Sequence, residues 1–227
     1  CAQVGMRILE VDGGDTPLVL AAHALLEKVL GVGRVEDIAS FRATVSPEAR
    51  VVYVPKLACA AYGRSIQGVV LGVYLGRLNM GMILYAGVRE AFRKLGVYST
   101  LRAHVVALLN SAANGNGRLP YTEPSARMDY LVSEFDAGSE LGRRYLREWG
   151  AFLAPCEYEQ PASQGLTPRR MDLVFQPIAA HSVPSRGQTA AVVREIYERV
   201  YRIHRVEQSA EYRRVVESLR EPVCPSE

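Results

Sequence analysis

The sequence predicts an α+β fold followed by a C-terminal helical extension. Three observations support this prediction. The chain opens with a short strand and an amphipathic helix, two apolar segments separated by a turn indicate a β-hairpin, and residues 183–227 show only helical periodicity. We therefore expect one domain over residues 6–178 and an extension over residues 183–227 that packs on this domain or on a partner.

In the first half of the chain, runs of β-branched and aromatic residues predict strands, and apolar residues at helical spacing predict helices. The expected strands are residues 7–11, 50–55, 66–78 and 80–88. The second and third of these strands form the hairpin, with its turn at Tyr62-Gly63-Arg64. The expected helices are residues 17–30, 35–43 and 92–111.

The second half begins with a long predicted loop. Residues 111–127 contain Asn114-Gly115-Asn116-Gly117 and two prolines, a composition typical of loops. Further strands are expected at residues 128–135, 151–158 and 171–177, with a helix at 139–149. In the extension, one helix is indicated by the helical spacing of Val193, Ile196, Val200 and Ile203, and another by that of Tyr212, Val215, Val216 and Leu219.

Composition excludes several classes of protein. With 227 residues, 48% of them hydrophobic and 22% charged, the chain has the proportions of a folded domain rather than of a disordered one. The net charge of +3 is too small for a general nucleic-acid binder. No apolar run reaches the roughly 18 residues of a membrane span, so we expect a cytoplasmic protein with neither a nucleic-acid nor a membrane partner.

Four cysteines, Cys1, Cys59, Cys156 and Cys224, are too scattered for a zinc site or a redox pair, and no other cluster has the spacing of metal ligands. We therefore expect free thiols and no bound metal. His23 and His104 lie in amphipathic helices and are interpreted as surface or core histidines. Because the sequence begins at Cys1, an N-terminal-cysteine hydrolase is kept as one hypothesis, in which this thiol is the nucleophile.

The chemically informative segment is the predicted strand 80–88 and the basic loop after it. The loop contains Arg93, Lys94 and Gly96 and opens a helix whose first N–H groups have no intrahelical acceptor. Such a helix end can bind phosphate, and glycine allows the backbone to approach a ligand closely. A capped helix with a solvated basic face would show the same pattern, so both interpretations are kept.

This segment resembles the acetyl-CoA pyrophosphate loop of the GNAT superfamily of N-acetyltransferases. The family pattern is Arg or Gln, two residues, Gly, one residue, and Gly or Ala, after a strand that ends in a small-apolar-Val step. Arg93, Gly96 and Ala86-Gly87-Val88 match it, whereas Tyr98 stands where Gly or Ala is usual. The resemblance implies a mixed, mostly antiparallel central sheet flanked by helices, with acetyl-CoA as cosubstrate. The cofactor contacts that it implies here are Ala86, Gly87, Val88, Arg93, Lys94, Leu95, Gly96, Val97, Tyr98 and Ser99.

A second match lies in the predicted helix 139–149. The family shows Asn, two residues, Ala, three residues, Tyr, three residues and Gly, and the corresponding residues here are Ser139, Gly142, Leu146 and Gly150. The resemblance therefore implies Ser139 as a further cofactor contact. The family's frequent general acid, the Tyr of this pattern, falls on Leu146, and Tyr145 is its neighbour in sequence.

The resemblance implies direct acyl transfer. An amine attacks the acetyl thioester, a backbone N–H near Val88 stabilises the oxyanion, and a base removes the ammonium proton. Glu134 is the candidate base, and Tyr85 and Tyr145 are candidates for the acid or for acceptor binding. The predicted function is an acetyl-CoA-dependent N-acetyltransferase acting on a small molecule or peptide amine. A non-catalytic GNAT-like module that binds CoA, or that regulates or assembles through its extension, is the alternative, and a homodimer is compatible with either.

Overall fold

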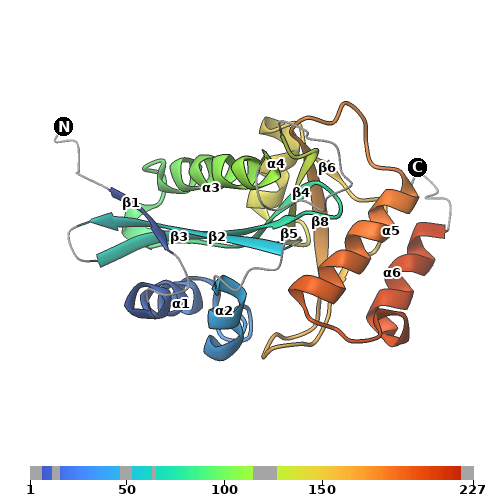
Figure 1. Cartoon of the computed structure of the whole chain (residues 1–227), viewed down its shortest axis with the longest axis horizontal. Helices are drawn as coiled ribbons and strands as arrows, with labels where there is room; N and C mark the ends of the chain where they lie inside the picture. Colours follow the sequence, from blue (N-terminus) through green and yellow to red (C-terminus); the bar gives the residue numbers. More distant parts are fainter. Residues whose placement is uncertain (1–6, 12–15, 47–52, 63–64, 115–126, 221–227) are drawn as a thin grey trace. The chain divides into compact units, whose positions relative to one another are not determined.

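A computed structural model describes the chain except for residues 1–6, 12–15, 47–52, 63–64, 115–126 and 221–227 (Figure 1). The chain divides into two compact units, residues 1–128 and 129–227. The predicted boundary between residues 178 and 183 does not coincide with this division and stays a prediction. Cys1, Cys224 and most of the predicted loop 111–127 lie outside the described residues.

The first unit is an antiparallel sheet between helices. Its strands are β1 (Arg7–Val11), β2 (Tyr53–Tyr62), β3 (Ser65–Leu75) and β4 (Met80–Val88), paired in that order. The helices α1 (Thr16–Leu30) and α2 (Ile38–Val45) lie on one face of the sheet, and α3 (Val97–Asn114) lies on the other (Figure 1). The predicted hairpin between the second and third strands is confirmed.

Two glycines of β3 let α3 pack closely on the sheet. The buried face of α3 consists of side chains four residues apart: Val97, Leu101, Val105, Leu109 and Ala113. A Cβ atom at Gly68 would lie 2.8 Å from Val97 Cγ1, and one at Gly72 would lie 2.9 Å from Val105 Cγ1. Side chains at these positions would crowd the buried face of α3, so the glycines allow α3 to lie close to β3.

The second unit is built around a long strand, β8 (Arg169–Pro177). Three further strands pair with it in antiparallel fashion: β5 (Tyr130–Asp136), β6 (Phe152–Leu153) and β7 (Glu159–Gln160). The helix α4 (Glu140–Glu148) packs against β5, β6 and β8, whereas α5 (Arg186–Glu195) and α6 (Ala210–Arg220) lie side by side (Figure 1). The C-terminal helices thus share a unit with β5 and β8.

Several predicted boundaries differ from the structure. β2 continues to Tyr62, beyond the predicted end at residue 55. The sequence does not predict this part of the strand because it is rich in small apolar residues, which favour strands only weakly. The predicted start at residues 50–52 lies outside the described residues. The predicted strand 151–158 shrinks to Phe152–Leu153, since Pro155 has no N–H for a ladder and the chain turns there. The helix predicted from residue 92 begins at Val97, after a short 3₁₀ turn at Glu90–Phe92.

The single helix predicted through Ile203 is also wrong. α5 ends at Glu195, and a π-helical turn follows it over Ile196–Val200. The N–H of Tyr201 donates to the carbonyl of Ile196, a bond across five residues rather than four, at 3.0 Å. Arg202 then takes a positive φ of 54° and the helix stops.

Among the helices of the described residues, none is long and apolar enough to cross a membrane. The described part of the chain likewise contains no group of three or more His, Cys, Asp or Glu side chains arranged to hold a metal ion.

Candidate functional site

The connection from β4 to α3 is anchored to β3 at its start. The N–H of Arg89 donates to the Gln67 carbonyl at 2.8 Å, and the Arg89 Nε donates to the Ile66 carbonyl at 2.8 Å. A tight turn follows, in which the N–H of Arg93 donates to the Glu90 carbonyl at 3.0 Å. The predicted basic loop therefore leaves the sheet at a fixed point.

Residues 93–96 form an exposed bend directly before α3. Lys94 and Gly96 have positive φ values of 64° and 79°. A Cβ atom at Gly96 would meet no atom within 4 Å, so this position favours glycine because of its backbone conformation and not for lack of room. The Arg93 Nε donates to the Val88 carbonyl at 3.3 Å, and the Leu95 side chain is 66% exposed.

The first turn of α3 presents polar groups beside this bend. The Gly96 carbonyl accepts hydrogen bonds from the N–H of Thr100 at 3.0 Å and from its hydroxyl at 3.1 Å, which fixes the start of the helix. Val97 is buried against the sheet, whereas Ser99 is exposed. The first N–H groups of a helix have no intrahelical acceptor, and with the helix dipole they attract anions. Arg93 and Lys94, both exposed, add two positive charges.

The three residues before the loop, Ala86, Gly87 and Val88, close β4. Gly87 is buried under α1, and a Cβ there would lie 3.1 Å from Leu26 Cδ2. Gly87 therefore allows α1 to approach the end of β4. Ala86 and Val88 are partly exposed.

Tyr85, on the same strand, contacts the connection between α1 and α2. Its hydroxyl accepts a hydrogen bond from the N–H of Glu36 at 3.3 Å. The Glu36 carbonyl in turn bonds the His23 Nε2 at 2.8 Å, and the Glu36 carboxylate accepts from the Thr44 hydroxyl at 3.0 Å. Glu36 is 3% exposed and His23 is 6% exposed. His23 is thus a core histidine with a hydrogen-bond partner, and Tyr85 belongs to a buried polar cluster.

In the second unit, Glu134 lies in a cluster of tyrosines. The Tyr158 hydroxyl donates to Glu134 Oε1, and the Tyr201 hydroxyl donates to Oε2 at 2.5 Å. Tyr158 is 1% exposed and Tyr201 is 4% exposed, whereas part of Glu134 reaches the surface. The carboxylate of the candidate base therefore has one hydroxyl donor on each oxygen.

Burial raises the pKa of Glu134 above the usual value of a glutamate, although the hydrogen bonds from both tyrosines and the charge of Arg169 act in the opposite direction. Burial, followed by the charge of Glu134, raises the pKa of Tyr158 well above its ordinary value, so that hydroxyl stays protonated as a donor. A carboxylate with a raised pKa is a stronger base than an exposed one. This pKa shift fits a proton-accepting role for Glu134.

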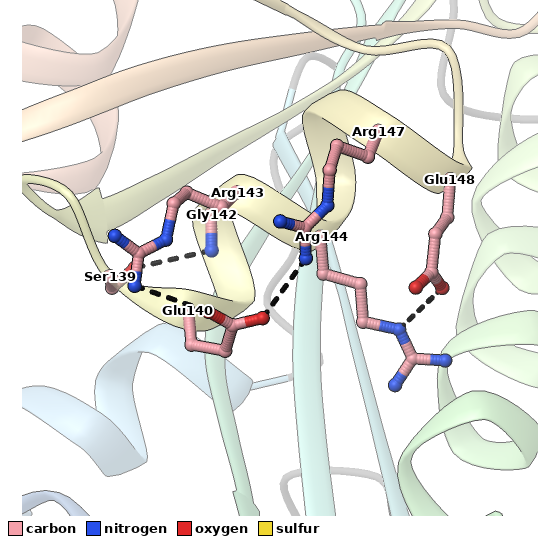
Figure 2. A network of polar contacts seen from close by, with 7 residues as sticks. All are labelled: Ser139, Glu140, Gly142, Arg143, Arg144, Arg147 and Glu148. Atoms are coloured by element: carbon pink, nitrogen blue, oxygen red, sulfur yellow. Dashed lines mark hydrogen bonds and ion pairs between the residues drawn. The ribbon is translucent and has the colours of Figure 1, made fainter.

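Tyr145 and Ser139 both belong to the region of α4. Tyr145 is 1% exposed, and its ring centroid lies 4.7 Å from that of Phe135 and 4.2 Å from that of Trp149. The structure thus places this candidate acid inside aromatic packing. Ser139 is the N-cap of α4, where its hydroxyl accepts from the N–H of Gly142 at 3.2 Å (Figure 2).

The exposed face of α4 is covered by ion pairs. Glu140 accepts from Arg143 at 3.1 Å and from Arg147 at 3.0 Å, and Arg144 donates to Glu148 at 2.6 Å (Figure 2). Because these side chains are about half exposed or more, each pair contributes little to stability. Leu146, at the position of the family's acid, is 36% exposed.

Within each unit, the structure brings some candidates together. The candidate cofactor-binding residues 86–88 and 93–99 lie along the β4–α3 connection and the start of α3, whereas Tyr85 contacts the α1–α2 connection. Glu134 meets Tyr158 and Tyr201, two side chains that sequence reasoning did not assign to the site. No local pattern reveals Tyr201, because 67 positions separate it from Glu134 in the chain.

No family model and no curated protein matches the sequence, but 238 chains of solved structures match the fold. A putative GNAT-family acetyltransferase from Bacteroides thetaiotaomicron is 12% identical, with a TM-score of 0.62 over 87% of this chain and 99% of its own. Ard1 from Thermoplasma volcanium is 15% identical, with a TM-score of 0.53 over 77% of this chain and 99% of its own. The ribosomal-protein-S18-alanine N-acetyltransferase from Escherichia coli is 10% identical, with a TM-score of 0.53 over 79% and 99%.

The chain therefore has the α+β fold of the GNAT superfamily, as the sequence predicts. At 10–15% identity the likeness to these acetyltransferases is one of fold.

Proposed function

From the GNAT fold and the β4–α3 connection, we propose that the protein is an acyl-CoA-dependent N-acyltransferase that moves an acetyl group from acetyl-CoA to an amine of a small molecule or peptide. The observation that supports this most strongly is the exposed bend at residues 93–96. Two basic side chains and the first turn of α3 meet there on a backbone that Gly96 bends with a positive φ of 79°. This is the chemistry that a pyrophosphate needs.

In the proposed reaction, the uncharged amine nitrogen attacks the thioester carbonyl carbon. The C–N bond forms, the C–S bond breaks, the ammonium proton goes to Glu134, and the CoA thiolate takes a proton. A backbone N–H near Val88 would stabilise the oxyanion. Glu134 suits proton removal because burial raises its pKa. Tyr85 and Tyr145 stay candidates for the acid or for acceptor binding, and Ser139 stays a candidate for a CoA contact.

The acceptor is proposed only as an amine. One structural neighbour is named as a ribosomal-protein-S18-alanine N-acetyltransferase and another as a NatC complex bound to Gag peptide and CoA, but these names describe those proteins. An acceptor screen should therefore include small amines and peptides with free α-amino groups.

The test is release of free CoA thiol from acetyl-CoA in the presence of each acceptor, for the wild type and for Glu134→Gln. Acceptor-dependent release that falls at least about 100-fold in the variant would support the proposal, since general-base catalysis typically contributes 10²–10⁴-fold. Binding of acetyl-CoA with no transfer to any acceptor would favour the non-catalytic alternative. The exposed Leu146 at the family's acid position is the observation that keeps this alternative open.

A further inference from the structure

Tyr201, which directly follows the π-helical turn after α5, contacts the candidate base directly. We propose that Tyr201 is a positioning residue whose hydroxyl holds one carboxylate oxygen of Glu134, so that the C-terminal extension forms part of the catalytic apparatus. This inference rests on the proposed function, in which Glu134 is the base. It goes beyond that proposal because it assigns a catalytic role to residues 183–220, which lie outside the predicted domain.

A hydrogen-bond chain orients the Tyr201 hydroxyl. Gln160 Nε2 donates to the Tyr201 oxygen at 2.9 Å, and the Tyr201 oxygen lies 2.5 Å from Glu134 Oε2. A tyrosine hydroxyl has one proton, and since its oxygen accepts from Gln160, that proton is directed to Glu134. Tyr158 donates to the other oxygen, Oε1. The carboxyl plane is thus fixed from two sides by groups on different elements.

The carboxylate keeps capacity to accept further hydrogen bonds. An ionised carboxylate has about four lone-pair sites, and the two tyrosine hydroxyls occupy two of them. Glu134 is the one residue of the three that is partly exposed, although its carboxyl group itself is buried. The two tyrosine hydroxyls therefore orient the carboxylate and leave lone pairs on it that can accept a proton.

The π-helical turn determines where Tyr201 points. With one residue inserted over Ile196–Val200, the Tyr201 side chain is rotated by roughly 100° relative to its place in a continuous α-helix. Backbone contacts fix the turn on both sides: Gln164 Nε2 donates to the Val200 carbonyl at 3.1 Å, and the N–H of Ile203 donates to the Tyr197 carbonyl at 2.9 Å. The Tyr197 hydroxyl donates to the Glu159 carbonyl. π-Helical turns are frequent at functional sites, which agrees with this placement.

The charged and titratable groups around Glu134 come from each element packed against it. Arg169 is on β8, Tyr158 precedes β7, and Tyr197 and Tyr201 belong to the extension. Tyr158 and Tyr197 have raised pKa values, chiefly because they are buried, so they act as neutral groups at ordinary pH. Both hydroxyl donors favour the ionised form of Glu134. Removal of either one should therefore make Glu134 harder to ionise.

The test is the pH dependence of kcat/KM for Tyr201→Phe, with Tyr212→Phe as the matched control. Tyr212 is in the same extension and packs on the Tyr197 ring 5.7 Å away, but it has no contact with Glu134. In Tyr201→Phe the acidic limb of the profile should move up by about one pH unit, because one hydrogen bond to a charged group corresponds to roughly that shift. The limb should not move in Tyr212→Phe. A loss of activity in Tyr201→Phe with the limb unmoved would indicate a purely structural role and overturn the proposal.

A second variant covers the case in which Tyr201→Phe does not fold. Gln160→Leu leaves Tyr201 in place and removes the donor that orients its hydroxyl, so the limb should move in the same direction by a smaller amount. An unmoved limb in this variant would count against the hydrogen-bond chain.

A third measurement separates this inference from the proposed function. The pKa of Glu134 can be measured by NMR from its carboxyl ¹³C signal in protein labelled at glutamate, and this titration does not require enzymatic activity. The signal is assigned by its loss in Glu134→Gln. Its midpoint should be higher in Tyr201→Phe than in the wild type. If the midpoint moves in a protein that transfers no acetyl group, the Tyr201–Glu134 contact is supported and the proposed enzymatic function is refuted. If the two midpoints are equal, the proposed role of Tyr201 is refuted, whether or not the protein is active.

Discussion

Replacing Gly68 by alanine tests how the candidate cofactor loop is positioned. Gly68 of β3 faces Val97, the first residue of α3, and the exposed bend at residues 93–96 directly precedes that residue. An added Cβ would lie 2.8 Å from Val97 Cγ1 and 3.0 Å from Leu101 Cδ1. The first of these distances is shorter than real Cβ contacts allow, so the Val97 side chain or the start of α3 must shift.

The expected cost follows from two opposing effects. Overpacking of a core by one methyl group costs about 1–3 kcal/mol. Removing a glycine from a strand returns roughly 0.5–1 kcal/mol of chain entropy. The free energy of unfolding should therefore fall by about 1–2 kcal/mol, and Tm by roughly 2–8 °C for a chain of this length.

A double-mutant cycle with Val97→Ala makes the test specific. Val97→Ala removes the Cγ1 atom that the new methyl group would meet, so the double variant should be about 1 kcal/mol more stable than the sum of the two single effects. Denaturant unfolding of the four proteins gives these free energies, and acetyl-CoA affinity should weaken in Gly68→Ala and recover in the double variant. Additive effects would show that α3 does not press on Gly68, and would refute this account of the loop's position.

Three further predictions concern single side chains. Arg93→Ala should weaken acetyl-CoA binding about 10-fold or more in calorimetry, because it removes a charged hydrogen-bond donor for phosphate, whereas Arg147→Ala on the exposed face of α4 should not. Activity of the wild type should rise with pH through a pKa higher than that of an ordinary glutamate, and Glu134→Gln should abolish this limb, whereas Glu157→Gln, which alters only a surface ion pair, should retain it. Ser139→Ala should lower the free energy of unfolding by about 1 kcal/mol through loss of the α4 cap, and an unchanged denaturant midpoint would contradict that role.

Much of the secondary structure of the first unit can be predicted from the sequence. The strand 80–88 is predicted with its correct bounds, since β-branched and large apolar residues fill it and a basic loop ends it. The exposed bend before α3 can likewise be located from the sequence, because the pattern from Arg93 to Gly96 is local. The sequence does not show why glycine stands at position 96. The structure shows that the backbone there has a positive φ, with open space around the position of an added Cβ.

The surroundings of Glu134 could not be predicted in the same way. Its partners come from residues 158 and 201, and hydrogen bonds between distant segments leave no periodic signal. The π-helical turn that directs Tyr201 also interrupts the helical spacing of Val193, Ile196, Val200 and Ile203, which by itself predicts one continuous helix. Tyr145 is adjacent to the family's acid position in sequence, but the aromatic packing around it becomes visible only in three dimensions.

The most direct measurement of the central claim is thermal unfolding with and without acetyl-CoA for the wild type, Gly96→Trp and Gly150→Trp. Both glycines have positive φ values, 79° and 60°, and open space around a Cβ, so the two substitutions cause similar backbone strain. A ligand at 100 times its Kd stabilises the folded state by about 2.7 kcal/mol, which is roughly 5–11 °C here. We expect this shift for the wild type and for Gly150→Trp, and its loss in Gly96→Trp. No shift in the wild type at millimolar acetyl-CoA, or an equal shift in all three proteins, would contradict it.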